Sequence, residues 1–135
     1  MGEPLLRMVD GVTVSVPSLD AGLDFYARHL GHEQVWRHDG LGQAGLRCPD
    51  SDTEIVLTTN LPAEPTWLVH SADAAAAAVV AGGGRVIAEP SDIPVGRVAI
   101  AEDPFGNRLV LIDLSKGTYR TDAAGLVTGV ERPPL

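Results

Sequence analysis

The sequence predicts an α+β fold built from two βαβββ modules, with curled mixed sheets around a central cleft and the helices on the outside. One strand, one helix and three strands follow one another twice, the strand segments show β-branched residues in alternation, and the proline-rich segment Asn60–Pro65 separates the two copies. Two copies of one supersecondary unit imply a pseudo-twofold domain with a shared cleft. We therefore assign residues 1–60 to the first module, 61–117 to the second and 118–135 to a C-terminal arm or tail, all within one structural domain.

The first module begins with a strand over Met8–Val16, where three valines alternate with small or polar residues. Pro17 ends this strand, and Ser18 is a suitable N-cap for an amphipathic helix over residues 19–30 that ends at Gly31. Turn residues then separate three further predicted strands, Glu33–Arg37, Gln43–Cys48 and Glu54–Thr59.

The second module repeats this order. A strand over Thr66–His70 precedes a helix over Asp73–Ala81, which three consecutive glycines terminate. The segment DPFGN (Asp103–Asn107) is a strong hairpin signal between the last two of three further strands, Arg85–Ala88, Gly96–Glu102 and Arg108–Asp113. After Ser115 the chain is polar and irregular, which is compatible with either an ordered arm or a loose tail.

The composition restricts the class of partner. The chain has 135 residues, 44% hydrophobic and 21% charged, which is normal for a globular protein. Its single cysteine, Cys48, excludes an intramolecular disulfide and suits a reducing compartment, so we expect a cytoplasmic protein. The net charge of −8 disfavours nucleic acids and anionic membranes, and no apolar run is long enough to span a bilayer. We expect a neutral or cationic small-molecule ligand.

Two segments, in this order, resemble the vicinal oxygen chelate superfamily, which includes glyoxalase I, the extradiol dioxygenases and the bleomycin resistance proteins. VPSLDAGLDFYARHLG (Val16–Gly31) is similar to the first strand-to-helix segment of that family, and VGRVAIAEDPFGNRLVLIDLSKG (Val95–Gly117) to its closing hairpin. The similarity covers about residues 6–117. The resemblance implies a homodimer with two composite sites.

Catalytic members of this family resemble one another in holding a divalent metal with side chains from four strands. Carried over one at a time, these positions fall on Gly11, Val56, Trp67 and Val110. None of the four offers a lone pair to a cation, so the resemblance implies the metal-free, drug-binding branch, with no metal and no cofactor. A shift of one residue would bring Asp10, Glu54 or His70 closer, but such a slip turns a strand residue to the opposite face, and only Glu54 keeps the parity of Val56.

The same alternation predicts which residues line the cleft. If the valines of the first strand pack under the helix, the residues between them face the other way, and cross-strand partners share that face. The expected ligand-binding residues are mostly apolar, with a few hydroxyls: Thr13, Val56, Thr58, Trp67, Val69, Val98, Ile100, Val110 and Ile112, together with Trp36, and with Arg47 at the rim. Trp67 either stacks on a planar ligand or fills the space of the metal; Trp36 is alternatively a core or dimer contact, and Arg47 a solvated side chain.

Candidates for acid–base catalysis are few. Glu54 and Glu102 are the acidic residues on the predicted cleft face, and burial would suit either as a general base; the alternative is a solvated edge carboxylate. His38 is the third candidate, with solvated surface as its alternative.

Two functions fit these residues. The favoured hypothesis is a metal-free binding protein of the bleomycin-resistance type, without catalysis, which gives self-resistance by sequestering a bulky, partly aromatic ligand or antibiotic. The alternative is a metal-independent isomerase, cyclase or lyase on the same scaffold, so enzymatic activity stays open. A metal-dependent glyoxalase or dioxygenase ranks third, because it needs ligands that the sequence lacks.

Overall fold

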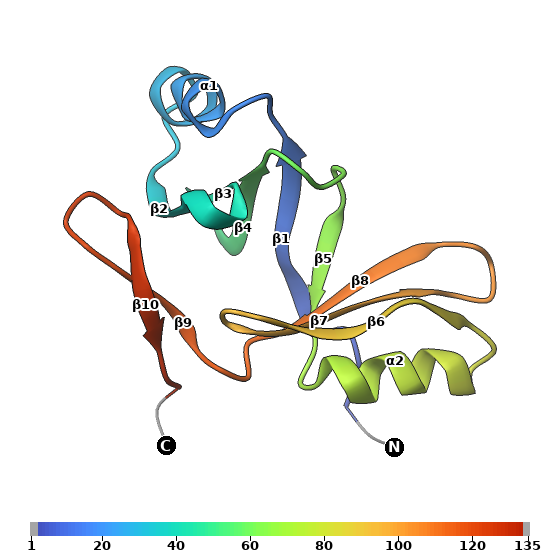
Figure 1. Cartoon of the computed structure of the whole chain (residues 1–135). Coiled ribbons are helices and arrows are strands. Elements are labelled where there is room, and N and C mark those ends of the chain that lie inside the picture. The colour runs from blue at the N-terminus through green and yellow to red at the C-terminus, as the bar shows by residue number, and fades with distance from the viewer. Residues whose placement is uncertain (1–2, 134–135) are drawn as a thin grey trace. The chain divides into compact units, whose positions relative to one another are not determined.

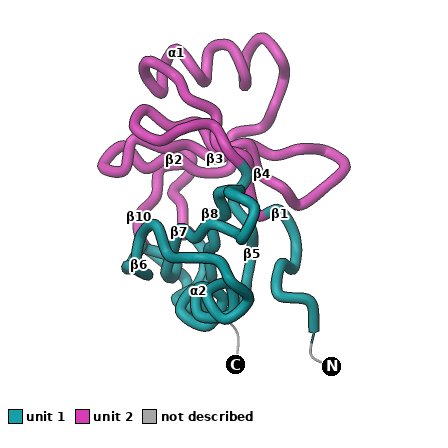
Figure 2. The backbone as a smooth tube through the Cα atoms, turned by 90° about the vertical axis from the view of Figure 1, so that its right-hand side faces the viewer, with its two compact units in different colours: residues 1–9, 65–118, 130–135 teal, residues 10–64, 119–129 magenta. Residues whose placement is uncertain are grey.

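The computed structural model describes residues 3–133 (Figure 1). The chain divides into two compact units: unit 1 comprises residues 1–9, 65–118 and 130–135, and unit 2 comprises residues 10–64 and 119–129 (Figure 2). Each unit contains one strand, helix and three strands in the predicted order. The predicted α+β class with two βαβββ modules is therefore confirmed.

The strands of unit 2 are β1 (Met8–Ser15), β2 (Gln34–His38), β3 (Gln43–Cys48) and β4 (Ser51–Thr58). Their order is β2-β3-β4-β1, with β1 parallel to β4 and the other pairs antiparallel. Leu46 and Leu57 are fully buried and form one apolar cluster with Leu19 of the helix and with Val14 and Val16. The expectation that the valines of the first strand pack under the helix is thus confirmed for Val14 and Val16.

The first helix begins as predicted and then changes type. Ser18 Oγ accepts a hydrogen bond from the Ala21 N–H at 3.1 Å and caps α1 (Leu19–Leu23). The chain continues as a π-helix over Asp24–His29, in which the Leu30 N–H bonds the carbonyl five residues earlier, Phe25 O, at 2.9 Å. Leucine and tyrosine spacing alone does not distinguish this winding from an α-helix, so the sequence predicted the span but not the geometry.

The elements of unit 1 are β5 (Pro65–Leu68), α2 (Ala72–Ala81), β6 (Arg85–Ile93), β7 (Gly96–Glu102) and β8 (Arg108–Asp113). The strand order is β5-β8-β7-β6, with β5 parallel to β8. Alanines of α2 pack closely on alanines of β7, in apolar clusters that include Ala76 with Ala99 and Ala75 with Ala101. The edge strand β6 runs past the predicted end at Ala88 to Ile93, because register shifts absorb the irregularity near Pro90.

The segment after Ser115 is ordered over the described residues 116–133. It forms β9 (Thr118–Thr121) and β10 (Val127–Glu131), which pair with each other. The Arg37 N–H donates to Gly125 O at 2.8 Å, and Arg37 forms a parallel bridge with Leu126, so the tip of this segment is fastened to β2. We call residues 119–129, the part that belongs to unit 2, the C-terminal hairpin. Among the helices of residues 3–133, none is long and apolar enough to cross a lipid bilayer.

Candidate functional site

One face of the unit 2 sheet carries the residues that the sequence placed opposite the helix. The register sets Gly11 beside Glu54, Thr13 beside Val56, and Val56 also beside Gly45 of β3. Neighbours in register share a face, so the predicted parity of the first module is confirmed, including that of Glu54.

Trp36 and Glu54 meet on this face. Trp36 lies opposite Gly45, and its indole lies so close to this glycine that a Cβ there would overlap the ring. Trp36 is only 8% exposed, and its Nε1–H donates to Glu54 Oε1 at 2.9 Å. The tryptophan is therefore a buried partner of a carboxylate, in agreement with the core contact given as the alternative for this residue.

Burial raises the pKa of Glu54. The hydrogen bond from Trp36 lowers this pKa, the negative charge of Asp10 raises it and the positive charge of Arg47 lowers it, with the net shift upward. The pKa of Asp10 is also raised by burial. A half-buried carboxyl group with a raised pKa holds and releases a proton closer to neutral pH than an exposed one, which is what general acid–base catalysis requires.

The C-terminal hairpin adds an aromatic residue that the sequence analysis missed. The ring of Tyr119 packs on Trp36 with centroids 4.7 Å apart and planes at 43°. Burial, and secondly the negative charge of Glu54, raise the pKa of Tyr119. The alternation in Thr118–Thr121 and the Asp-Ala-Ala-Gly turn after it are the signals that would have found this hairpin. We refer to Asp10, Trp36, Arg47, Glu54 and Tyr119 together as the Glu54 site.

His38 lies beside this site, and its ring accepts a hydrogen bond from the backbone. Its Nδ1 accepts the Leu41 N–H at 3.2 Å and so caps the 3-10 helix η2 (Asp39–Leu41). With Nδ1 as acceptor, the neutral ring carries its proton on Nε2. The His38 ring centroid lies 5.9 Å from that of Tyr119.

The other polar candidates have partners within the protein. Thr13 Oγ1 donates to Pro62 O at 2.7 Å and accepts the Glu64 N–H at 3.0 Å, and Thr58 Oγ1 donates to Asn60 Oδ1 at 3.2 Å. Both threonines are buried and hold the segment after β4, which accounts for their polarity without a ligand. Arg47 pairs with Glu33 at 3.1 Å.

In unit 1 the structure corrects the predicted faces of Trp67 and Val69. Trp67 lies beside Leu111 in the register of β5 and β8, and Leu111 belongs to the apolar cluster formed with α2. Val69 is a buried member of that cluster, and Trp67 packs against it. The prediction that these two residues face away from the helix is wrong, because the register used for this strand was shifted by one residue.

The rest of the unit 1 prediction is confirmed in its parity. Val98 pairs with Ile112 and Ile100 with Val110, and these four share the face opposite α2 with Thr66 and Leu68. Glu102, the remaining catalytic candidate, sits at the end of β7 and forms an ion pair with Arg85 at 3.0 Å.

The register also corrects one of the four positions compared with metal ligands. In the first module, Thr13 is the neighbour of Val56, and Gly11 lies two residues before Thr13. In the second module, Thr66 is the corresponding neighbour of Val110, and the residue two positions before Thr66 is Glu64. The position assigned to Trp67 therefore belongs to Glu64. One carboxylate with a glycine and two valines does not fit a divalent cation, and residues 3–133 contain no group of three or more His, Cys, Asp or Glu side chains suited to a metal ion.

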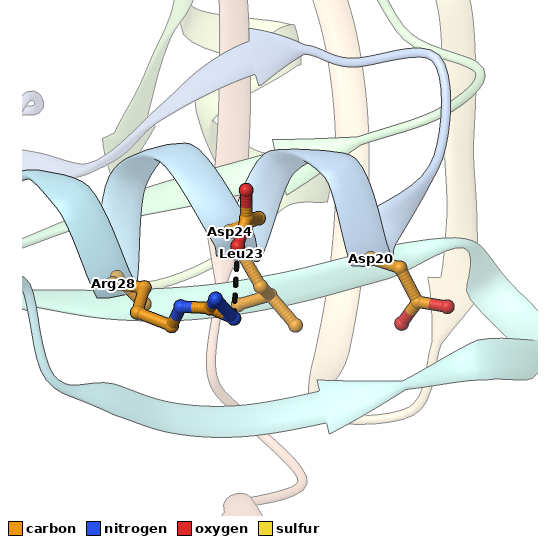
Figure 3. A pocket seen from close by; sticks show the side chains of 5 residues that line it. Asp20, Leu23, Asp24 and Arg28 are labelled. Atoms are coloured by element: carbon orange, nitrogen blue, oxygen red, sulfur yellow. Dashed lines mark ion pairs between the residues drawn. The ribbon is translucent and has the colours of Figure 1, made fainter.

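An open depression elsewhere in unit 2 is a feature of the helix surface. Asp20, Leu23, Asp24, Ala27 and Arg28 line it, and Arg28 pairs with Asp24 at 3.1 Å along the helix (Figure 3). Both charged side chains are largely exposed, and none of the predicted site residues lines the depression.

Comparison with known proteins agrees with this fold. A sequence profile of the Glyoxalase/Bleomycin resistance protein/Dioxygenase superfamily matches residues 9–111. Two curated proteins named "Putative glyoxylase CFP32", from Mycobacterium bovis and Mycobacterium tuberculosis, are 38% identical over 95 residues, which covers 64% of this chain and 36% of each relative. The chain thus spans about a third of the length of these relatives.

Solved structures with the same fold include methylmalonyl-CoA epimerase from Mycobacterium tuberculosis, with a TM-score of 0.65 and 21% identity over 84% of this chain and 91% of that one. The hypothetical protein BH1468 from Bacillus halodurans has a TM-score of 0.63 and 18% identity, over 78% of this chain and 93% of that one. At these identities the likeness concerns the fold alone. With the profile match spanning most of the chain, this protein belongs to the Glyoxalase/Bleomycin resistance protein/Dioxygenase superfamily.

Proposed function

We propose that this chain is a metal-independent enzyme of its superfamily, an isomerase, cyclase or lyase, in which Glu54 exchanges a proton with a small organic substrate. The observation that carries the proposal is the half-buried Glu54 carboxyl group, held at 2.9 Å by the Trp36 indole. Trp67, the aromatic residue on which the binding hypothesis relied, lies on the helix side of its sheet and so does not support stacking on a ligand.

The chemistry follows from the environment of the carboxyl group. Ionised Glu54 removes a proton from a carbon next to a carbonyl group, and the protonated acid then returns it, so no electrons are exchanged with an external group. A general base of this kind contributes roughly a hundredfold to ten-thousandfold to the rate. The net charge of −8 favours neutral or cationic substrates.

Deuterium incorporation tests this proposal. The protein is incubated in D2O with a panel of hydroxyketones, 2-substituted thioesters and amino ketones, and NMR measures exchange at carbon. We expect exchange with the wild type, a loss of at least about a hundredfold with Glu54→Gln, and little change with Glu102→Gln. Equal exchange rates for wild type and Glu54→Gln would exclude Glu54 as the base.

A second candidate is the metal-free binding protein that sequesters an antibiotic. It is supported by the apolar face of unit 1, where Val98, Ile100, Val110 and Ile112 lie together, and by the absence of ligand side chains at three of the four metal positions. Calorimetric titration with bleomycin and with other bulky, cationic, partly aromatic antibiotics distinguishes the candidates. A binding protein takes up one of them stoichiometrically and unchanged, and Glu54→Gln retains the affinity. Sedimentation measures the homodimer that this candidate includes.

A further inference from the structure

The C-terminal hairpin lies outside the segment that matches the superfamily, residues 9–111, yet its residues belong to unit 2 (Figure 2). It brings Tyr119 to the Trp36 indole, whose N–H is bonded to Glu54. A segment beyond the common fold thus contributes a ring to the candidate site.

We propose that the C-terminal hairpin completes the Glu54 site, with Tyr119 as a positioning residue that holds the Trp36 indole in its donating orientation and keeps water from the Glu54 carboxyl group. This inference rests on the proposed function, because it names the element that maintains the proton-transfer group. Tyr119 acts through Trp36 rather than on the substrate.

The attachment of the hairpin supports this role. The Arg37 N–H donates to Gly125 O at 2.8 Å, and Arg37 immediately follows Trp36 on β2. The Arg37 side chain is itself held by Asp20 and Asp39, each at 2.9 Å. The turn of the hairpin is closed by Asp122, whose Oδ1 accepts the N–H groups of Ala124 and Leu126 at 2.8 and 3.0 Å. The hairpin is therefore fastened at its tip beside the same strand whose tryptophan it covers.

The charged and titratable groups around Glu54 come from several elements. Asp10 of β1 opposes ionisation of Glu54, Arg47 of β3 favours it, and Tyr119 of β9 is neutral below its own raised pKa. His38 of β2 contacts the Tyr119 ring. Removal of the Tyr119 ring leaves the charges of Asp10 and Arg47 in place and admits water. A change in the fluorescence of Trp36 therefore reports on the loss of this ring and not on a change of nearby charge.

Fluorescence of Trp36 in the full chain tests the inference without a substrate. The sequence has two tryptophans, so Trp67→Phe makes Trp36 the sole emitter. Emission, excited at the red edge of the indole band, is followed from about pH 4 to about pH 9, where the midpoint reports ionisation of Glu54. Glu54→Gln in the same background removes the transition and identifies it.

Tyr119→Phe and Tyr119→Leu are then compared. We expect Tyr119→Phe to preserve the emission and the midpoint, because the ring remains. Tyr119→Leu is expected to shift emission to the red and to increase quenching by acrylamide, because water then reaches the Trp36 indole. A Tyr119→Leu variant that retains the emission and quenching of Tyr119→Phe overturns the inference.

Gly125→Val provides a second variant, remote from the aromatic rings. Gly125 has φ +81°, and a Cβ there would approach the Gln34 side-chain nitrogen at 2.9 Å, so a β-branched residue detaches the tip. The same red shift and increased quenching are expected, and unchanged emission and quenching with a detached tip, seen as faster exchange of the Arg37 N–H, count against the inference. Unchanged deuterium exchange at the substrate in Glu54→Gln would contradict only the proposed function, so the two failures are distinguishable.

Discussion

Trp36 and Glu54 are joined by a 2.9 Å hydrogen bond although their strands, β2 and β4, are not neighbours. Strand β3 lies between them, and at the crossing point it carries Gly45, which pairs with Trp36 on one side and with Val56 on the other. Strands lie about 4.8 Å apart, so the indole spans roughly two strand spacings only where the middle strand has no side chain. The bond therefore depends on a glycine that makes no hydrogen bond with either side chain.

Gly45→Ala tests this dependence. The new methyl group would overlap the Trp36 indole, so the ring has to move away from Glu54. Overpacking of this kind costs about 1–3 kcal/mol, which we expect as a loss in the free energy of unfolding measured with urea. Gly82→Ala is the matched control, because its Cβ meets backbone oxygens at an ordinary 3.6 Å and φ is −87°. Equal losses in the two variants would show that the indole does not need the glycine.

Trp36→Phe removes the hydrogen-bond donor and keeps an aromatic ring. The hydrogen bond from Trp36 lowers the pKa of Glu54, so its loss leaves burial less opposed and the pKa rises further. A hydrogen bond to a charged group contributes about 1.5–3 kcal/mol, and the variant should lose stability by that order where Glu54 is ionised. Carboxyl ¹³C NMR measures the pKa directly. A pKa of Glu54 equal to that of the wild type would mean that the bond is absent in solution.

Glu54→Gln changes how stability depends on pH. The folded protein raises the pKa of Glu54, so folding favours the protonated acid. This contribution is fully present below the unfolded value, about 4.3, and is lost as the pH rises through the folded pKa. The wild type should therefore lose stability relative to Glu54→Gln as the pH rises above about 4.3, as measured by urea midpoints in a series of buffers. Glu102→Gln is the control, and a wild-type curve parallel to that of Glu54→Gln would contradict the raised pKa.

The sequence predicted the two modules and the faces of β1 and β4 in unit 2, because periodicity and turn residues are local signals. It placed Trp67 wrongly, because the linker Asn60–Pro65 contains no feature that fixes the register of the next strand. The two modules compared with each other would have corrected this. Val16 and Val69 occupy corresponding positions, each two residues before a serine N-cap. Because Val16 faces the helix of its own module, Val69 is expected to face the helix of the second module. Trp67, two residues before Val69 on the same strand, then faces that helix as well.

Local sequence patterns could not predict the hydrogen bond between Trp36 and Glu54 or the position of Tyr119. The bond joins residues 18 positions apart across an intervening strand, and Tyr119 reaches Trp36 from a segment outside the repeated modules. Contacts of this kind follow from tertiary packing. Hydrophobic alternation indicates which face of a strand a residue occupies, but not which distant residue it contacts. The Ser18 cap and the DPFGN turn, in contrast, are specified by residues within five positions of one another.

Trp67→Ala separates the corrected assignment from the original one. Trp67 packs against the cluster of Val69 and Leu111 in unit 1, so the truncation leaves a cavity there. We expect a loss of about 2–4 kcal/mol in the free energy of unfolding, with the pH midpoint of Trp36 fluorescence unchanged. A smaller truncation, Trp67→Phe, keeps most of the packing and serves as the control. A Trp67 variant that shifts the Glu54 titration while remaining fully stable would contradict the helix-side assignment.

Asp113 is a buried carboxylate, and its hydrogen bonds hold neighbouring segments of unit 1 together. It is 3% exposed, and it accepts the Ala72 N–H at 2.8 Å, the Arg97 N–H at 2.9 Å and the Ser115 hydroxyl at 2.7 Å. Burial raises its pKa, but these donors together outweigh burial, so the pKa is lowered. The carboxylate thereby ties the start of α2 to β7 and β8.

The lowered pKa sets the direction of the pH effect. The contribution of the Asp113 carboxylate to stability is present above its pKa in the unfolded chain, about 3.9, and is lost as the pH falls through its pKa in the folded protein. Asp113→Asn brings an amide group against backbone donors and should cost about 2–4 kcal/mol at neutral pH, measured by urea unfolding, with the gap closing in acid. Asp92→Asn, at an exposed carboxylate paired with Lys116 and Arg97, is the control and should cost much less. A gap for Asp113→Asn that stays constant from neutral pH into acid would show that the lost hydrogen-bond geometry, and not the charge of the carboxylate, holds the helix to the sheet.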